Sequence, residues 1–279
     1  MNNIDEYKLR NELEKKIFKY NDSDLIDIII KNQKLTDESD SMSSREFEDN
    51  IKKINHNQIA DLILDNFNSD KINAELNKIK PMTIKPVIKK NFPYENPREM
   101  QLETISRIYD AIEKGYKYII LEAVSGFGKS VIAATLSNIY SKDKSYILTT
   151  TNQLGNQFVH DFEDFKISKL NPRSSFSCKK TTHSCSAYRC MYSNCYHYKA
   201  SNFSKDFGKP MSCEYLYNLK ENLKDTSAVC TYDYFIQETF YHSNYLKPRK
   251  LVICDEGHNI DNKITDNISK DISNKIVKN

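Results

Sequence analysis

The sequence lacks long hydrophobic runs. Its longest unbroken apolar stretches, such as residues 118–121 and 251–254, are only four residues long, whereas a membrane-spanning helix needs about 20. The amino-terminal segment MNNIDEYKLR has neither an apolar core nor a small-residue cleavage site, so a secretory signal is not expected. We therefore expect a soluble protein of the cytoplasm, or of the host cytoplasm if the source is viral.

Apolar residues are also few, at 39% of 279 residues, although a chain of this length can still bury one or two hydrophobic cores. We find no internal repeat. Residues 1–80 are rich in Asn, Lys, Ile, Asp and Glu and show helical spacing in places, which predicts a helical N-terminal extension. Prolines, which cannot continue a helix, then predict a linker at residues 81–92. They are Pro81, Pro86, Pro93 and Pro97.

Helix-like and strand-like segments alternate after the linker. Alternation at this spacing predicts an α/β fold in which a parallel sheet is covered by helices on both faces. The expected helices span residues 98–115, 128–140 and 152–165, and the expected strands span residues 116–123, 145–151 and 250–258.

The segment LEAVSGFGKS lies between an expected strand and an expected helix. Its pattern Ala123-x-x-x-x-Gly128-Lys129-Ser130 fits a phosphate-binding loop, with Ala in place of the usual first Gly. Gly126 and Gly128 allow a sharp turn that directs backbone N–H groups at phosphate oxygens. Lys129 adds a cation for the β- and γ-phosphates, and the hydroxyl of Ser130 can bind Mg²⁺. The alternative is a glycine turn between core elements.

Two carboxylates follow the last expected strand, in LVICDEGH. A phosphate-loop enzyme needs a carboxylate at the end of a neighbouring buried strand for Mg²⁺, and a residue that orients the attacking water. We expect Asp255 to hold Mg²⁺ and Glu256 to act as the base. The alternative is that Asp255 and Glu256 are two solvated acids at the end of a strand, which would be a common finding if DEGH stood alone. The phosphate loop followed by DEGH in one chain favours an ATP site.

These motifs resemble those of superfamily 2 helicases. EAVSGFGKS is similar to their Walker A element, and DEGH to the Walker B element of the DEAH-box type. Together with the cysteine-rich segment between them, they resemble the XPD/DinG family of iron-sulfur DNA helicases, over about residues 92 to 260. The resemblance implies an ATP-dependent DNA helicase of 5′–3′ polarity, and leaves open whether it serves DNA repair or DNA replication.

The resemblance also implies a domain organisation. Residues 93–165 would form the first half of a P-loop RecA-like domain, residues 166–225 a cysteine-rich insertion, and residues 226–279 the strand that carries DEGH. Superfamily 2 helicases close their ATP site between two such domains, and motifs III to VI are not found in this chain. We therefore expect a second chain or a further region to supply them. Alone, this chain is expected to bind ATP better than it hydrolyses it, and not to unwind DNA.

Further residue roles come from the resemblance. FPYENPREMQ is similar to the adenine-recognition segment of the family, with Arg98 and Gln101 in the R-x-x-Q spacing. LTTTNQLGNQ is similar to motif Ia, which contacts the bound strand, and His258 corresponds to the histidine that couples hydrolysis to nucleic-acid binding. The DNA-contacting residues expected from motif Ia are Thr150, Thr151 and Gln157.

Two positions depart from the family pattern. The loop has Ser125-Gly126-Phe127 where Ser/Thr-Gly-Thr/Ser is common, and Gly257 replaces the usual Ala of motif II. Neither change removes a catalytic group, so Ser125 and Phe127 remain expected nucleotide-binding positions.

Seven cysteines in a chain without a secretory signal favour metal or redox chemistry over a disulfide framework. Cys230 and Cys254 lie in apolar strand-like runs and are expected to be buried hydrophobic residues. The other five have the spacing Cys178-x6-Cys185-x4-Cys190-x4-Cys195-x17-Cys213.

Four of these five thiolates could bind a [4Fe-4S] cluster or Zn²⁺, and the absence of any metal is a third possibility. The resemblance favours the cluster, with Cys178 as the first ligand and Cys213 as the last. Spacing does not choose the middle pair from Cys185, Cys190 and Cys195. Zinc remains a possible metal because His183 and His197 lie in the same segment and histidine is a zinc ligand.

The same segment is basic and aromatic. Residues 165–225 contain eleven Lys or Arg against four Asp or Glu, together with ten Phe or Tyr. Cations for phosphates and rings for base stacking are features of grooves that bind single strands, so single-stranded or forked DNA is the expected partner. A solvated basic loop with a few core aromatics is the alternative.

Two other functions remain possible. The chain could be a nucleic-acid-binding protein that is not a motor, with a metal-stapled insertion and a vestigial nucleotide site. It could also be a different phosphate-loop ATPase such as a kinase, but this leaves DEGH and the segment similar to motif Ia unexplained.

Overall fold

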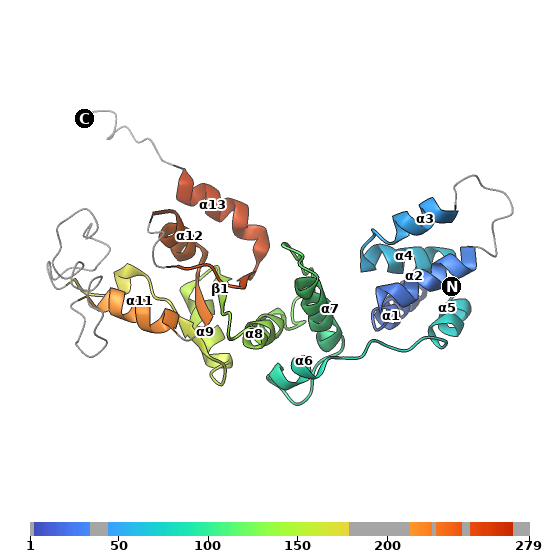
Figure 1. Cartoon of the computed structure of the whole chain (residues 1–279), viewed down its shortest axis with the longest axis horizontal. Helices are drawn as coiled ribbons and strands as arrows, with labels where there is room; N and C mark the ends of the chain where they lie inside the picture. Colours follow the sequence, from blue (N-terminus) through green and yellow to red (C-terminus); the bar gives the residue numbers. More distant parts are fainter. Residues whose placement is uncertain (1–2, 34–43, 179–212, 225–226, 242–245, 270–279) are drawn as a thin grey trace. The chain divides into compact units, whose positions relative to one another are not determined.

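We describe the fold from a computed structural model of the chain, which describes residues 3–33, 44–178, 213–224, 227–241 and 246–269 (Figure 1). The chain divides into two compact units. One contains residues 1–90 and 94–122, and the other contains residues 91–93 and 123–279. Each unit contains its own buried apolar residues.

The second unit is built on a parallel sheet. In the part of the chain that the structure describes, its strands are β1 (Ser145–Thr149), β2 (Ile167–Lys169), β3 (Ser227–Thr231) and β4 (Leu251–Cys254). Their spatial order is β2-β3-β1-β4, and every neighbouring pair is parallel. The predicted α/β class with a parallel sheet is therefore confirmed.

Helices cover both faces of this sheet. On one face, Ile147 of β1 and Val229 of β3 are buried together with side chains of α8 (Lys129–Ile139) and α9 (Asn152–Asp161). On the other face, Tyr146 and Leu148 pack with α11 (Glu214–Lys224) and α12 (Tyr232–Tyr241). Successive residues of β1 thus point to opposite faces, as the pleat of a strand requires. A short η1 turn (Arg173–Ser175), an η3 turn (Gly257–Asn259) and α13 (Ile260–Ile268) complete the described elements of this unit.

The strand predicted at residues 116–123 is absent. This segment has no regular secondary structure, and the side chains of Tyr118 and Ile120 are 89% and 94% exposed. Its run of apolar residues is typical of a strand buried in a parallel sheet. A strand also needs a neighbouring edge that accepts its hydrogen bonds, however, and an apolar run does not reveal whether such an edge is present.

The first unit is helical. Its helices are α1 (Asn3–Ile17), α2 (Asp22–Gln33), α3 (Ser44–Ile51), α4 (His56–Asn66), α5 (Ser69–Leu76), α6 (Pro86–Asn91) and α7 (Gln101–Glu113). Ile17, Leu25 and Ile59 are fully buried in the core shared by α1, α2 and α4. Proline starts α6 at the first helical position, where its missing N–H costs nothing. No helix among the described residues is both long and apolar enough to cross a membrane.

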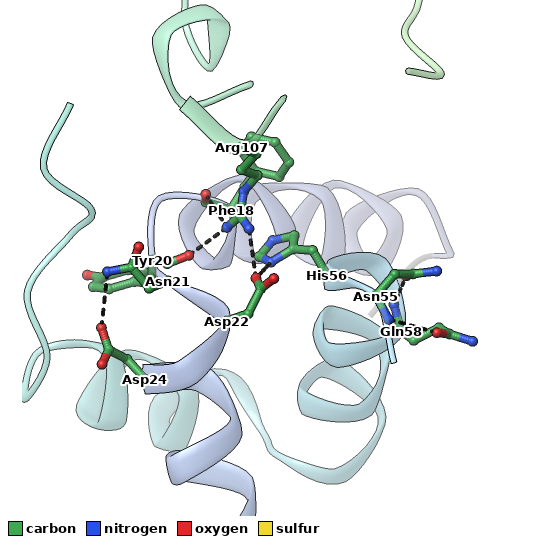
Figure 2. Close-up of polar contacts among 9 residues, drawn as sticks. All are labelled: Phe18, Tyr20, Asn21, Asp22, Asp24, Asn55, His56, Gln58 and Arg107. Carbon is green, nitrogen blue, oxygen red and sulfur yellow. Dashed lines mark hydrogen bonds and ion pairs between the residues drawn. The ribbon is translucent and has the colours of Figure 1, made fainter. Parts of the chain in front are cut away.

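A capping box fixes the start of α4. The side-chain oxygen of Asn55 accepts a hydrogen bond from the Gln58 N–H at 3.0 Å, and the Gln58 side chain accepts one from the Asn55 N–H at 2.9 Å (Figure 2). This exchange satisfies two N–H groups at the helix start that have no partner inside the helix. It therefore helps to set the position of the next residue, His56.

A polar cluster joins α7 to the N-terminal helices. Arg107 of α7 donates to Asp22 at 2.7 Å and to the backbone oxygens of Phe18 and Tyr20 at 3.1 and 2.5 Å (Figure 2). Its guanidinium also lies over the ring of Phe18, 4.8 Å from the ring centre. The Nδ1 atom of His56 lies 2.7 Å from the same Asp22 carboxylate. The Asp22 carboxylate thus joins α7 to α2 and α4, and the backbone oxygen of Phe18 joins α7 to the end of α1.

The Asp22 carboxyl has a lowered pKa. Burial raises its pKa, but the hydrogen bond with His56 and the charge of Arg107 together outweigh burial and bring the pKa to about 2. A folded-state pKa below the unfolded value means that this carboxylate stabilises the fold above the unfolded pKa, near 3.8. The contribution is lost as the pH falls from there through the folded value.

We predict that Asp22→Asn lowers the free energy of unfolding at pH 7 by about 1 kcal/mol. The value is modest because 45% of the Asp22 side chain is exposed and solvent screens the ion pair. The difference from wild type should shrink as the pH falls from the unfolded pKa near 3.8 through the folded value of about 2, since the wild-type carboxylate becomes protonated over this range. Urea titrations followed by circular dichroism at several pH values would measure it.

Asp24→Asn provides the matched control, because Asp24 lies in the same first turn of α2 and its carboxylate accepts a long hydrogen bond from Asn21, at 3.4 Å. It should change stability by less than about 0.5 kcal/mol. Equal losses in the two variants would contradict a special role for Asp22.

Candidate nucleotide-binding site

The phosphate loop has the backbone that its glycines predict. Gly126 and Gly128 have φ angles of +81° and +94°, in the left-handed region that side chains other than glycine rarely adopt. Gly128 is the residue that caps α8, and Lys129 is the first residue of that helix. The loop therefore ends at a helix N-terminus, where free N–H groups and the helix dipole favour an anion.

The side chain of Lys129 lies across its own loop. Its Nζ donates a hydrogen bond to the backbone oxygen of Ala123 at 3.3 Å. Ala123 holds the first position of the loop pattern, so this bond joins the two ends of the loop. Ser130 follows in α8 and is exposed. The positions of both side chains fit the binding of a phosphate and its Mg²⁺.

Asp255 is held at the end of β4. Its N–H donates to the backbone oxygen of Leu148 at 3.0 Å, which extends the pairing of β1 and β4 by one residue. Its own backbone oxygen accepts a hydrogen bond from the hydroxyl of Tyr232 at 2.7 Å. The backbone of this acidic residue is therefore fixed on both sides.

The environment of Asp255 raises the pKa of its carboxyl group. Burial is the main cause and the charge of Glu256 adds to it, while the positive charge of Lys129 acts in the opposite direction. The lysine of the phosphate loop and the acid of DEGH therefore lie close enough to interact. A carboxylate that is partly buried beside another acid is stabilised by a cation, so Asp255 is chemically suited to hold Mg²⁺.

Glu256 has a left-handed backbone, with φ of +51° and ψ of +50°. A non-glycine residue in this region carries strain, which is often found at functional sites. Its carboxylate lies 3.4 Å from Nδ1 of His258, whose side chain is 71% exposed. The Nε2 atom of His258 is 3.1 Å from the side-chain amide of Asn259. Glu256 and His258 are thus coupled to each other at the surface that follows β4.

Gln101 is the first residue of α7 and Arg98 precedes this helix, both in the first unit. The N–H of Arg98 donates to the Gln101 side chain at 2.9 Å, and Gln101 is only 3% exposed. The R-x-x-Q spacing therefore produces a local contact. Their proposed role in adenine recognition remains a prediction.

The predicted DNA-contacting residues follow β1 directly. Thr151 caps α9, since its hydroxyl accepts a hydrogen bond from the Leu154 N–H at 3.2 Å. Thr150 and Thr151 line a pocket of about 530 Å³. Gln157 is exposed on α9. The three residues are accessible, and their contact with DNA remains a prediction.

The predicted metal ligands are only partly covered by the structure. Cys178 and Cys213 are partly buried, and Cys213 packs against the core under α11. The three central cysteines, Cys185, Cys190 and Cys195, lie outside the described residues. Across residues 3–33, 44–178, 213–224, 227–241 and 246–269, no group of three possible metal ligands occurs.

The other two cysteines lie in strands, as predicted. Cys230 of β3 is 1% exposed, and Cys254 of β4 is partly buried. Burial raises the pKa of both thiols, which keeps them protonated and unreactive near neutral pH. They therefore behave as small apolar side chains of the sheet.

The fold and these motifs define a P-loop helicase-type domain of superfamily 2. Residues 95–278 match the ResIII family model, described as type III restriction enzyme, res subunit, and the chain belongs to this family. This family assignment implies an ATP-dependent, helicase-like domain that binds nucleic acid. A comparison with curated proteins and one with solved structures each produced no match.

Sequence reasoning missed two residues of this unit. Tyr232 holds the backbone of Asp255, and no pattern in the sequence marks it out. Glu238 is 3% exposed and lies four residues after the buried Tyr234 on α12. This spacing places both on one face of the helix, so an acidic residue in the apolar run YFIQETF was a signal that could have been used.

We predict that Gly126→Ala weakens ATP binding about tenfold. A side chain at a left-handed position costs roughly 1–2 kcal/mol, and relief of this strain would turn the N–H groups away from the phosphates. Titration of the protein with a fluorescent ATP analogue would measure the affinity.

Gly257→Ala is the matched control within the second unit. A Cβ atom there would meet only the Cδ1 atom of Ile260 at 3.9 Å, an ordinary contact, and the backbone has no positive φ. Nucleotide affinity should stay within about twofold of wild type. An unchanged affinity in Gly126→Ala would count against the phosphate loop as the binding site.

Proposed function

We propose that the chain is the ATP-binding part of a DNA helicase, which couples ATP hydrolysis to translocation on single-stranded DNA. The observation that carries the proposal is the phosphate loop, with positive φ at Gly126 and Gly128 directly before the N-terminus of α8. The charge of Lys129 also acts on the Asp255 carboxyl, which relates the loop to the second motif that a phosphate-loop motor requires. The membership of residues 95–278 in a helicase-type family supports it.

Each residue has a proposed role. Lys129 contacts the β- and γ-phosphates, the loop N–H groups from Ser125 to Gly128 hold the phosphate oxygens, and Ser130 and Asp255 hold Mg²⁺. Glu256 orients and deprotonates the attacking water. The resemblance to the XPD/DinG family implies roles for four further residues. Arg98 and Gln101 recognise adenine, Phe127 lies next to the nucleotide, and His258 couples ATP hydrolysis to nucleic-acid binding.

The DNA-binding part of the proposal concerns the second unit. Thr150, Thr151 and Gln157 contact the backbone of the bound strand, and the basic, aromatic insertion lies beside its path. Four of the five cysteines in that insertion hold a [4Fe-4S] cluster, or Zn²⁺ in the alternative case. The resemblance further implies that a second RecA-like domain, from another chain or a further region, supplies motifs III to VI.

We predict that single-stranded DNA stimulates the slow ATP hydrolysis expected of the chain alone, and that Lys129→Ala and Glu256→Gln each abolish this stimulated hydrolysis. The two variants should differ in binding. Lys129→Ala loses a phosphate contact and should bind ATP weakly, whereas Glu256→Gln should bind ATP at near wild-type affinity. Phosphate release and nucleotide titration would separate these effects.

Asp261→Asn is the control, because Asp261 is exposed on α13, beyond DEGH. It should hydrolyse ATP at the wild-type rate. If DNA fails to stimulate wild type, and wild type and Lys129→Ala bind DNA with equal affinity in the presence of ATP, the binding protein without motor activity becomes the better function.

We predict that Cys213→Ser loses the visible absorbance of an iron-sulfur cluster while ATP binding is retained, because Cys213 lies in the insertion and not in the phosphate loop. Anaerobic absorbance spectra with iron and zinc analysis would measure this. Cys230→Ala should keep the full metal content, since Cys230 is buried in β3. An unchanged spectrum in Cys213→Ser would exclude this residue as a ligand, and stoichiometric zinc without iron would favour the alternative metal.

A further inference from the structure

A basic segment of the first unit follows α5. Residues 77–90 contain five lysines and no acidic residue, and the segment has no Phe, Tyr, Trp or His. All five lysines are exposed. They are Lys78, Lys80, Lys85, Lys89 and Lys90. Exposed cations without aromatic rings can attract phosphates, but they offer no surface on which unpaired bases can stack.

The fold holds this basic segment in place. Ile88 of α6 is fully buried, which fixes the second half of the segment against the unit. Pro81 and Pro86 each restrict one backbone φ angle. The N–H of Met82 donates to the backbone oxygen of Lys19 at 2.7 Å, which ties the middle of the segment to the chain just after α1. The segment is thus preorganised, so a ligand that binds it has to order little of the backbone.

Carboxylates neutralise only part of the charge of the basic segment. Lys78 pairs with Glu75 at 2.6 Å, and Lys85 pairs with Asp110. The ammonium groups of both pairs belong to exposed side chains, and exposed ion pairs of this kind are weak enough to exchange for a phosphate. The other three lysines form no ion pair with the residues that the structure describes. They are Lys80, Lys89 and Lys90.

We propose that the basic segment binds the phosphates of duplex DNA without reading the base sequence. A duplex carries one negative charge per about 1.7 Å of its axis, about twice the density of either of its strands, so a surface that offers only cations favours the duplex. The cysteine-rich segment differs, because its cations are interleaved with aromatic residues that suit unpaired bases. The inference rests on the proposed function, because it assumes that the nucleic acid is DNA.

Replacement of the three lysines without an ion pair tests the proposal. The triple variant Lys80→Gln, Lys89→Gln, Lys90→Gln removes three positive charges from exposed positions and leaves the buried residues unchanged. The triple variant Lys80→Arg, Lys89→Arg, Lys90→Arg keeps the charges and should bind duplex DNA as wild type does. Circular dichroism would verify that both variants are folded.

Binding would be measured with the full 279-residue protein. A labelled duplex and a labelled single strand of the same length would each be titrated at several salt concentrations, with fluorescence anisotropy as the readout. In the glutamine variant, duplex affinity should fall about tenfold or more at about 0.1 M salt. The slope of log affinity against log salt should decrease by about one for each lysine that contacts a phosphate. Affinity for the single strand should stay within about threefold of wild type, because the aromatic residues of the cysteine-rich segment are unchanged.

A matched control separates the basic segment from net charge. The triple variant Lys8→Gln, Lys52→Gln, Lys53→Gln makes the same change of charge at exposed positions of the same unit. These lysines lie close in sequence to acidic residues, so their surroundings are not purely basic. The control should keep the wild-type duplex affinity and salt slope.

The outcomes separate this inference from the proposed function. If wild type binds neither DNA, the proposed DNA-binding function fails and the inference fails with it. If wild type binds the single strand but not the duplex, the proposed function stands and the inference is overturned. Wild-type duplex affinity in the glutamine variant, an equal loss in the control variant, or an equal loss for the single strand would each overturn it as well.

Discussion

The parallel pairing of β1 with β4 is the constraint on which the candidate site depends. Leu148 lies opposite Cys254, and the next N–H along β4, that of Asp255, bonds to the backbone oxygen of Leu148. A shift of one residue in this register would turn every side chain of β4 to the opposite face of the sheet. The acidic residue and Lys129 of the phosphate loop would then no longer interact. The buried β1 strand thus determines where the chemistry of DEGH is placed.

The second unit carries three features that are typical of a nucleotide site. The phosphate loop offers backbone donors and a cation, Asp255 is a carboxylate whose raised pKa favours a bound cation, and Glu256 is held in a strained backbone conformation. Burial disfavours the charged form of the Asp255 carboxyl, and Mg²⁺ with a nucleoside triphosphate would offset this charge. The N-terminus of α8 likewise favours an anion such as a phosphate. The structure is therefore consistent with the helicase-type family to which the chain belongs.

Prediction from sequence succeeded where the signal was local. The helices α7, α8 and α9 and the strands β1 and β4 lie within the segments where apolar periodicity predicted them, and Gly126 and Gly128 have the positive φ angles that the loop pattern requires. It failed at residues 116–123, because a strand depends on a partner edge as well as on its own side chains. It also missed Glu238, whose burial depends on Arg173 and Tyr215, two residues that are distant in the sequence.

The sequence by itself determined the class of protein, since a phosphate loop and a strand-end acidic pair in one alternating α/β chain are patterns of neighbouring residues that local geometry requires. The tertiary structure decided which groups meet. It brought Asp255 within electrostatic range of Lys129, anchored α7 to the N-terminal helices through Arg107 and Asp22, and buried Glu238 in α12. The physical reason is that hydrogen bonding and burial between distant segments depend on strand register and helix packing, which no short stretch of sequence contains.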